Sequence, residues 1–296
     1  MVMSEAGSAA EDAPLFGTMT SIKPLVDALA CLTQPSRAHD VIVSQGTAGL
    51  RFSTATPTHQ ASAILPPSAF TTLRVNPADL RIRLNLSALQ DCLAVLSAAT
   101  PSDVQLSFSN ARVRVHCTAA DECSIHAELA ALHAAEQSSE LIEPADANDV
   151  AAFIIGADAF RDALTELDYA SAQTVQLSFL PEQPSVRFVA PASCADGQAR
   201  VMVELVAQSS GFQAVRCDGE QNATFRTEHV LRATRALGVA ESVKLVLNEA
   251  GVLSILCRLK GSAVEDRSFV EFVMLAQQIE GDDEDDERGS DEAVYK

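Results

Sequence analysis

Thr20–Leu32, with the sequence TSIKPLVDALACL, and Gly156–Leu167, with the sequence GADAFRDALTEL, decide the fold of this chain. The two stretches share an Asp-Ala-Leu core, which begins at Asp27 in the first and at Asp162 in the second. In both, apolar residues recur at the spacing of an amphipathic helix. The distance between the copies is far longer than the period of a solenoid repeat. The sequence therefore predicts two copies of one domain.

A second pair of matching stretches supports this duplication. Ser68–Arg74 reads SAFTTLR and Ser210–Arg216 reads SGFQAVR, and each precedes a second apolar helix pattern and a series of strands. At 296 residues the chain has room for two domains, each with its own core. We expect an N-terminal tail at residues 1–13, a first domain at 14–133, a linker at 134–149, a second domain at 150–279 and an acidic tail at 280–296.

The charge of the chain is acidic and unevenly distributed. The chain has 40 Asp and Glu residues against 21 Lys and Arg residues, a net charge of −19. Part of this excess lies in residues 281–292, GDDEDDERGSDE, a block of like charge that is typical of a disordered tail. Taken alone, the net charge argues against a nucleic-acid partner, because a basic surface is the usual sign of one. The acidic excess of the folded part is smaller than the total.

The sequence lacks the signals that are typical of several classes of protein. The first residues have neither the basic nor the apolar region of a secretory signal, and no run approaches the length of a membrane span. The seven cysteines are odd in number and form no C-x-x-C pair, which favours reduced, mostly buried thiols in an intracellular protein. No Gly-rich phosphate loop, G-x-S-x-G elbow or H-E-x-x-H motif occurs.

The hydrophobic patterns predict an α+β fold in each half, with antiparallel strands and two amphipathic helices. Helices are expected at Ile22–Leu32, Leu86–Ala98, Asp158–Tyr169 and Thr227–Leu237, with Ser21 as an N-cap and Gly238 as a C-terminal cap. Strands are expected at Leu15–Met19, Val41–Ser44, Leu50–Thr54, Ala61–Leu65, Thr72–Val75, Arg81–Leu84, Val104–Ser109, Arg112–Thr118, Cys123–Leu129, Val150–Ile155, Thr174–Phe179, Ser185–Ala190, Ala199–Ala207, Phe212–Cys217, Ser242–Leu247, Val252–Leu259 and Phe269–Leu275.

Several stretches, in this order, resemble one known family. They are Arg81–Leu93 (RIRLNLSALQDCL), Phe160–Asp168 (FRDALTELD), Gln176–Phe188 (QLSFLPEQPSVRF), and the closing pair Gly251–Ser254 (GVLS) and Ser268–Phe272 (SFVEF). The resemblance extends over most of Leu15–Gln277. On these segments the chain is similar to the Rad-one/Rec-one family, whose members are subunits of the nine-one-one (9-1-1) DNA damage checkpoint clamp. This family belongs to the sliding clamp superfamily of proliferating cell nuclear antigen.

The resemblance implies a sliding DNA clamp fold, with antiparallel sheets outside and two helices of each domain on the inner face of a ring. It implies a heterotrimer with Rad-nine-like and Hus-one-like subunits, a clamp loader as a further partner and double-stranded DNA through the ring. Such a clamp acts in the nucleus and recruits checkpoint signalling and repair proteins. It is neither an enzyme nor dependent on a cofactor or metal.

If the helices line the hole, basic side chains on their solvent faces are the candidate DNA contacts, because they neutralise phosphates without reading bases. Arg232 and Arg235 lie three residues apart and share one face of the last helix. Lys23 and Arg161 are the other candidates. Acidic residues lie on the same helices, and Leu86–Ala98 contains no cation. We therefore expect the partner subunits to supply the remaining contacts.

The resemblance also assigns surfaces to partners. Edge strands at Cys123–Leu129 and Arg200–Leu205 are expected to pair with neighbouring subunits by strand addition. The expected interface residues are Cys123, Ile125, Ala127, Val201, Val203 and Leu205. In the linker, Leu141, Ile142 and Pro144 form an apolar island that docks repair or checkpoint peptides, packs the linker onto the sheet, or does both.

Two constellations resemble metal sites. One set is His116, Cys117, Cys123 and His126. In strands these residues face opposite ways, so four zinc ligands would not converge. The other set is Asp158, Asp162, Glu166 and Asp168, which would suit a metal-dependent 3′–5′ exonuclease. Acids at this spacing more often form one solvated helix stripe. A homotrimeric replication processivity clamp and this nuclease are the alternative functions.

Overall fold

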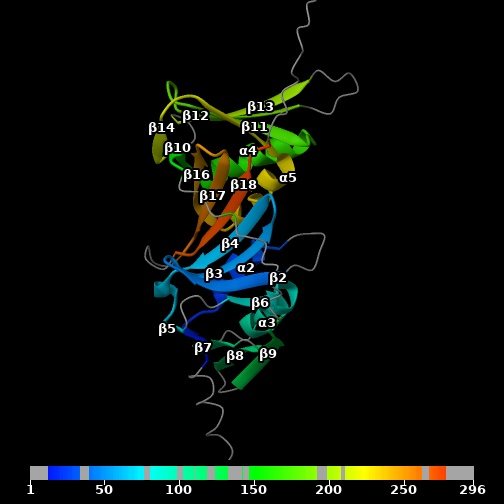
Figure 1. Ribbon diagram of the computed structural model, residues 1–296, viewed down its shortest axis with the longest axis vertical. Coiled ribbons are helices and arrows are strands. Elements are labelled where there is room, and N and C mark those ends of the chain that lie inside the picture. Colours follow the sequence, from blue (N-terminus) through cyan, green and yellow to red (C-terminus); the bar gives the residue numbers. More distant parts are fainter. Residues whose placement is uncertain are drawn as a thin grey trace, which may run out of the picture.

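The computed structural model describes residues 13–33, 40–76, 81–98, 103–109, 111–118, 124–132, 142, 147–191, 199–207, 211–261 and 267–277. Within these ranges the chain forms two similar halves, one above the other along the longest axis (Figure 1). The predicted boundaries between domains, linker and tails stay predictions, and both predicted tails lie almost wholly outside the described residues. None of the described helices is long and apolar enough to cross a membrane.

The first half contains the elements from β1 to β9. They are β1 (Leu15–Met19), α2 (Lys23–Ala30), β2 (Asp40–Gly46), β3 (Gly49–Thr56), β4 (His59–Leu65), the short 3-10 helix η1 (Pro67–Ala69), β5 (Thr72–Val75), β6 (Arg81–Asn85), α3 (Leu86–Ala98), β7 (Asp103–Phe108), β8 (Arg112–Thr118) and β9 (Ser124–Ala130).

The second half repeats this order from β10 to β18. Its elements are β10 (Asp149–Gly156), α4 (Ala157–Tyr169), β11 (Thr174–Leu180), β12 (Ser185–Pro191), β13 (Arg200–Val206), β14 (Ala214–Cys217), β15 (Gln221–Arg226), α5 (Thr227–Leu231), α6 (Thr234–Leu237), β16 (Ala240–Asn248), β17 (Val252–Leu259) and β18 (Phe269–Leu275). The match between the two orders confirms the duplication and the α+β class.

The strands form three antiparallel sheets. A five-stranded sheet, β5-β1-β7-β8-β9, lies at one end of the long axis, and a four-stranded sheet, β13-β12-β11-β15, lies at the other (Figure 1). The middle sheet has nine strands in the order β14-β10-β16-β17-β18-β4-β3-β2-β6. It is continuous because β18 of the second half pairs with β4 of the first, from Phe269↔Ile64 to Met274↔His59. Backbone hydrogen bonds therefore join the two halves.

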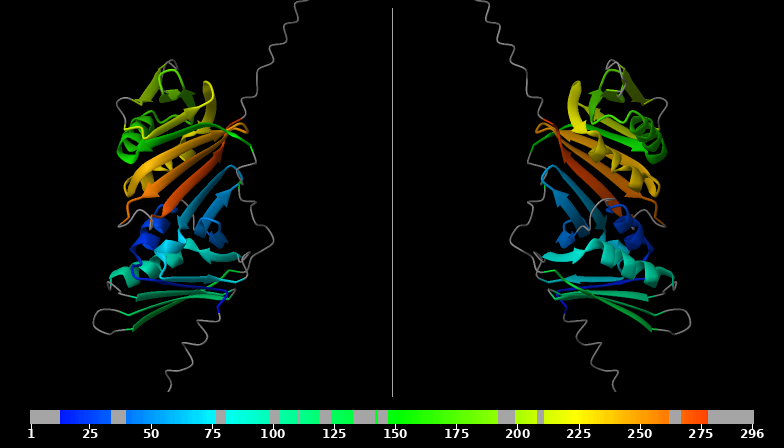
Figure 2. Two further views of the ribbon diagram at one scale, coloured as in Figure 1. Left: turned by 90° about the vertical axis from the view of Figure 1, so that its left-hand side faces the viewer. Right: turned by 90° about the vertical axis from the view of Figure 1, so that its right-hand side faces the viewer.

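The helices form because each buries one apolar stripe against these sheets. In α3 the stripe is Leu86, Leu89, Leu93 and Leu96, each at most 2% exposed. The side chain of Asn85 caps this helix, since its Oδ1 accepts a hydrogen bond from the Ala88 N–H at 2.9 Å. In α4 the stripe is Phe160, Ala163, Leu164 and Leu167. Figure 2 shows that the helices lie on one side of the molecule.

The structure differs from the sequence prediction at the end of the second helix pattern. The expected helix Thr227–Leu237 is broken into α5 and α6. The amides of Ala233 and Ala236 donate to carbonyls three residues back, at 3.2 and 3.0 Å, which tightens the backbone at the break. Gly238 has φ −63°, so it ends the segment in the right-handed region and not in the left-handed cap expected of it. The prediction also missed β15.

The first helix begins one residue later than predicted. Ile22 occupies the N-cap position and its side chain makes no capping bond, although the Ser21 Oγ accepts from the Lys23 N–H at 3.3 Å. Mostly buried thiols were expected, and among the described cysteines Cys31, Cys117 and Cys257 are buried, while Cys92 and Cys217 are half-buried. Burial raises the pKa of Cys31 to about 12, which keeps this thiol protonated at neutral pH.

Candidate nucleic-acid interface

The helical segments of both halves contribute to one face of the molecule (Figure 2). α2 packs against α3 in the first half, and α4 packs against α5 and α6 in the second. Arg232, between α5 and α6, contacts β4 of the first half, and Arg235 of α6 contacts the segment after α2. A DNA duplex that lay along this face would meet the solvent-facing side chains of these helices.

Two of the four predicted DNA contacts are paired with carboxylates on their own helices. The Lys23 Nζ lies 2.8 Å from the Asp27 Oδ2. The Arg161 guanidinium lies 2.9 Å from the Asp158 carboxylate and 3.8 Å from that of Asp162. Such exposed pairs add little stability, so they can open. While closed, they cancel the positive charge of Lys23 and Arg161.

Arg232 is held in a different way. Its Nη1 lies 3.1 Å from the Nδ1 of His59, the first residue of β4. A guanidinium can only donate hydrogen bonds, so the His59 Nδ1 accepts and the ring proton is on Nε2. Burial first, and then the charges of Arg232 and His229, lower the pKa of His59 to about 3. The ring is therefore neutral at pH 7, and Arg232 keeps its full charge.

Arg235 is exposed, and its acceptor is also uncharged. Its Nη1 donates to the backbone carbonyl of Thr33, just after α2. The same segment approaches the backbone of α6, since the Cys31 Sγ lies 3.9 Å from the Arg235 carbonyl oxygen. Both arginines of the broken helix are thus bound by neutral acceptors of the first half, whereas Lys23 and Arg161 are neutralised.

His229 completes the packing around His59. The two rings have centroids 5.1 Å apart, and the Phe272 ring centroid lies 6.4 Å from that of His59. The His229 Nε2 lies 3.2 Å from the Glu228 carboxylate. Burial, followed by the Arg232 charge, lowers the pKa of His229, and Glu228 only partly opposes this shift. His59 is 0% exposed, so its orientation is set by these neighbours.

The other helices offer no further free positive charge within their described residues. The exposed side chains of α3 are Ser87, Asp91, Ala94, Val95 and Ala98. Those of α4 are Asp158, Asp162, Thr165, Glu166, Asp168 and Tyr169. The exposed side chains of α3 are therefore mostly small and uncharged, whereas those of α4 are mostly acidic. Within the described part of the chain Arg232 and Arg235 form no ion pair, although the Glu228 carboxylate is close enough to partly oppose the effect of burial, which lowers the pKa of Arg232.

The predicted interface strands lie at sheet edges. β9 ends the five-stranded sheet and β13 ends the four-stranded sheet, at opposite ends of the molecule (Figure 1). Ile125 and Ala127 on β9, and Val201 and Val203 on β13, are half-buried and pack against the core. Leu205 is 7% exposed. Cys123 lies outside the described residues.

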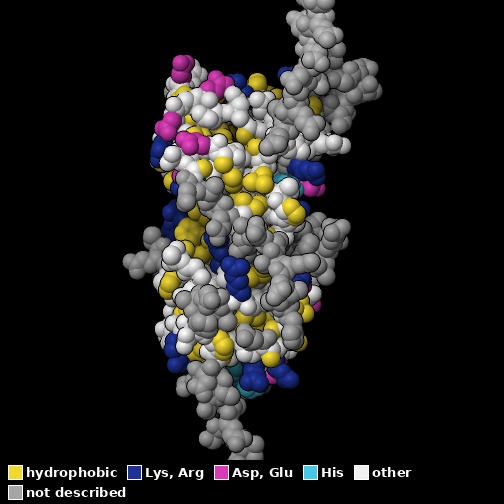
Figure 3. Space-filling view, viewed as in Figure 1, with side chains coloured by type: hydrophobic (Ala, Val, Ile, Leu, Met, Phe, Trp, Pro, Cys, Tyr) yellow, Lys and Arg dark blue, Asp and Glu magenta, His cyan; other side chains and the backbone are white. Residues whose placement is uncertain are grey.

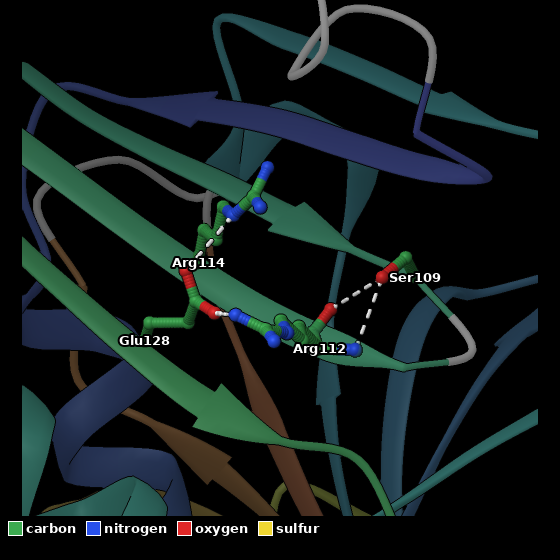
Figure 4. A network of polar contacts seen from close by, with 4 residues as sticks. All are labelled: Ser109, Arg112, Arg114 and Glu128. Atoms are coloured by element: carbon green, nitrogen blue, oxygen red, sulfur yellow. Dashed lines mark hydrogen bonds and ion pairs between the residues drawn. The ribbon is translucent and has the colours of Figure 1, made fainter. Parts of the chain in front are cut away.

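An ion-pair network covers the outward face of β8 and β9 (Figure 4). Arg112 and Arg114 both donate to the Glu128 carboxylate, the second through its Nε at 3.2 Å. The Arg112 contact first, and then that of Arg114, lowers the pKa of Glu128. The Ser109 Oγ accepts from the Arg112 N–H at 3.1 Å at the adjoining turn. These cross-strand contacts order β9 without using the hydrogen-bonding edge that faces away from β8.

The remaining predicted sites are only partly described. In the linker, Ile142 is half-buried, while Leu141 and Pro144 lie outside the described residues. His116 and Cys117 face opposite ways as predicted, because Cys117 is 0% exposed and His116 is half-buried. The His116 ring instead stacks on His126, with centroids 4.3 Å apart. Across the parts of the chain that are described, no group of three or more His, Cys, Asp or Glu side chains could hold a metal ion.

Sequence reasoning missed the acceptors of the two arginines. His59 lies 173 residues from Arg232, and Thr33 lies 202 residues from Arg235. Thr33 acts through its backbone carbonyl, which every residue type has. His59 stands in an ordinary strand pattern at the start of β4. The pairing of β18 with β4, which brings these residues together, has no local signal in the sequence.

The architecture defines the class of protein as a sliding clamp fold. One chain of the PCNA2–PCNA3 complex from Sulfolobus tokodaii superposes with a TM-score of 0.67 over 88% of this chain and 99% of its own, at 11% identity. A sequence search of curated proteins returned no significant match. The family model of the repair proteins Rad1/Rec1/Rad17 matches residues 15–257. The chain belongs to this Rad1/Rec1/Rad17 family, which confirms the resemblance inferred from its sequence.

Proposed function

We propose that this protein is one subunit of a heterotrimeric, ring-shaped checkpoint clamp that is loaded onto damaged DNA. In this role it is a scaffold and not an enzyme, and it acts in the nucleus. Its two neighbours are Rad-nine-like and Hus-one-like subunits, and a clamp loader opens and closes the ring around double-stranded DNA. The family and the clamp fold support a DNA repair clamp, and the surfaces described above support the finer assignment.

The observation that carries this proposal is the pairing of β18 with β4 inside the chain. By position in the repeat, β9 corresponds to β18 and β13 corresponds to β4. At this internal junction Val270 of β18 lies opposite Ala63 of β4, and Phe272 lies opposite Ala61. All four side chains are buried. Their counterparts are Ile125 and Ala127 on β9 and Val203 and Val201 on β13. A neighbour that repeated the internal junction at each edge would place six domains around a closed ring.

The helix face supports unlike neighbours. A homotrimer would repeat the almost uncharged face of α3, the acidic face of α4 and the two arginines Arg232 and Arg235 three times around the hole. The carboxylates of α4 repel phosphates, whereas a clamp needs cations around its whole channel. The chain from Sulfolobus tokodaii was itself solved in a complex of two different clamp proteins. We infer that unlike subunits supply the cations that this one lacks.

Within this subunit, we assign Arg232 and Arg235 as the main DNA contacts. Their acceptors are neutral, so their charge is available to phosphates. Lys23 and Arg161 contribute only when their carboxylate partners release them. These contacts reach the backbone of the duplex and not its base edges, which suits a ring that slides without sequence preference.

The opposite face is the proposed docking surface for repair and checkpoint peptides. Figure 3, which has the same orientation as Figure 1, shows hydrophobic side chains exposed around the waist between the two halves. Val246, Leu256 and Phe269 are half-buried on the nine-stranded sheet, and Leu275 is 38% exposed. Peptides with apolar anchors would bind here together with Leu141, Ile142 and Pro144 of the linker.

Edge variants test the ring directly. Ile125→Lys on β9 and Val203→Lys on β13 should each abolish one neighbour contact, because a charge would enter the buried row. Val215→Lys is the matched control, since Val215 lies on β14, an edge strand that faces no neighbour in the proposed ring. The subunits are co-expressed and the captured partners are counted. Loss of a different partner with each edge variant is expected, and full assembly of both variants would contradict the proposal.

A further inference from the structure

The two arginines assigned to DNA belong to the second half, but their acceptors belong to the first. Arg232 binds His59 on β4, and Arg235 binds the carbonyl of Thr33 after α2. Both contacts cross the junction that β18 and β4 form. The basic part of the helix face is therefore built by both halves together.

The chemistry of the His59 acceptor is specific. An Asp or Glu at this place would hold Arg232 equally well but would cancel its charge. A hydrophobic residue would leave the charge free but would remove a hydrogen bond from a half-buried guanidinium, which is costly. A neutral imidazole meets both needs, because its Nδ1 accepts and the ring carries no charge.

His59 is buried, and its backbone and ring both contact neighbouring residues. Its backbone N–H donates to the Thr56 Oγ1 at 3.2 Å, and the Thr56 Oγ1 donates to its carbonyl at 3.0 Å. Its ring centroid lies 5.1 Å from that of His229 and 6.4 Å from that of Phe272. The remaining ring nitrogen, Nε2, is buried and makes no hydrogen bond to any described residue. Arg232 is thus the polar contact that this ring makes in the described structure.

We propose that His59 is the positioning residue for Arg232, and that it holds this cation towards DNA without neutralising it. The inference rests on the proposed function, since it assumes that Arg232 contacts phosphate. It makes the DNA-contacting site a composite of both halves. The docking of β18 on β4 then determines where the positive charge of this subunit lies.

The test uses the assembled ring on a closed DNA circle and measures how retention of the ring falls with salt. Arg232→Gln should lower the slope of log affinity against log salt by about 1, as expected for one lost phosphate contact. His59→Asp should lower it by a similar amount, because the carboxylate cancels the guanidinium charge. His59→Asn, whose Oδ1 can accept in place of Nδ1, should leave it unchanged. Arg216→Gln, an exposed arginine on β14, is the control for total charge.

A double variant separates the two proposals. If His59 acts through Arg232, His59→Asp should change nothing further in a chain that already carries Arg232→Gln. If Arg232→Gln leaves the salt slope unchanged, the DNA contact itself is wrong. Two results would overturn only the positioning role, provided that Arg232→Gln lowers the slope. In the first, His59→Asp has no effect on the slope. In the second, His59→Asp lowers the slope equally whether or not the chain also carries Arg232→Gln.

A failure of His59→Asp to assemble would not end the test. His59→Asn then decides it, alone and combined with Arg232→Gln, with thermal unfolding as a second readout. Retention of DNA binding and of the coupling between the two positions supports the positioning role. An Asn variant that assembles but loses DNA as strongly as Arg232→Gln contradicts it.

Discussion

At the scale of single residues, the neutral state of His59 makes the fold sensitive to acid. Its pKa in the folded protein is about 3, far below the ordinary value of 6.5. Below pH 6.5 the unfolded chain binds a proton that the folded chain excludes. The stability that depends on neutral His59 is therefore present above pH 6.5 and is lost as the pH falls towards 3.

We predict that the free energy of unfolding falls by about 2 kcal/mol between pH 7 and pH 5 through His59 alone. His229 acts in the same direction, because its pKa is also lowered. Urea unfolding at the two pH values measures the effect. The His59→Asn chain should show a shallower fall over this range. An equal fall in both chains would mean that His59 titrates normally in the folded state.

The four candidate DNA-contacting cations differ in whether their partners are charged or neutral. Arg235→Gln should weaken DNA retention by the assembled ring and reduce its salt dependence. Lys23→Gln should have a smaller effect, because a Lys23 ammonium that is paired with Asp27 makes no phosphate contact to lose. Salt titrations of the two variants side by side provide the comparison. A larger effect at Lys23 would show that neutral acceptors do not mark the DNA contacts.

At the scale of elements, the junction of β18 with β4 should control how the halves unfold. Phe272 is 1% exposed on β18, and its ring lies beside His59. Phe272→Ala should lower the free energy of unfolding by roughly 3–5 kcal/mol. Calorimetry should then resolve two transitions, because the halves no longer unfold together.

Leu275→Ala on the same strand is the matched control, as Leu275 is 38% exposed. Its effect should stay within about 0.5 kcal/mol. A single sharp transition in the Phe272→Ala chain, with little loss of stability, would indicate that the halves are coupled elsewhere.

Elements with a complete local signal were predictable from the sequence. The Leu stripe placed α3 at Leu86–Ala98, which the structure confirms. β15 was missed because its sequence, QNATFR, is short and polar and buries only Phe225 fully. The break between α5 and α6 was missed because the residues around it contact the first half, and a helical period carries no information about such contacts. The candidate cations were visible in the sequence, but their acceptors came together only through the β18–β4 pairing.

At the scale of the whole molecule, the chain combines a net charge of −19 with a proposed place around DNA. A negative net charge opposes binding to DNA, and the part of the structure where this matters is the helix face. There the exposed side chains of α3 are almost uncharged and those of α4 are acidic. A ring of three such subunits would bind DNA weakly. A ring in which two unlike neighbours supply cations resolves the conflict, with Arg232 and Arg235 as this subunit's share.

Stoichiometry tests this account most directly. Native mass spectrometry of the tagged protein, purified from its own cells, counts the subunits in the intact assembly. We predict one copy of this chain with one copy each of two different clamp proteins. A homotrimer, or a monomer that carries the activity alone, would contradict the account.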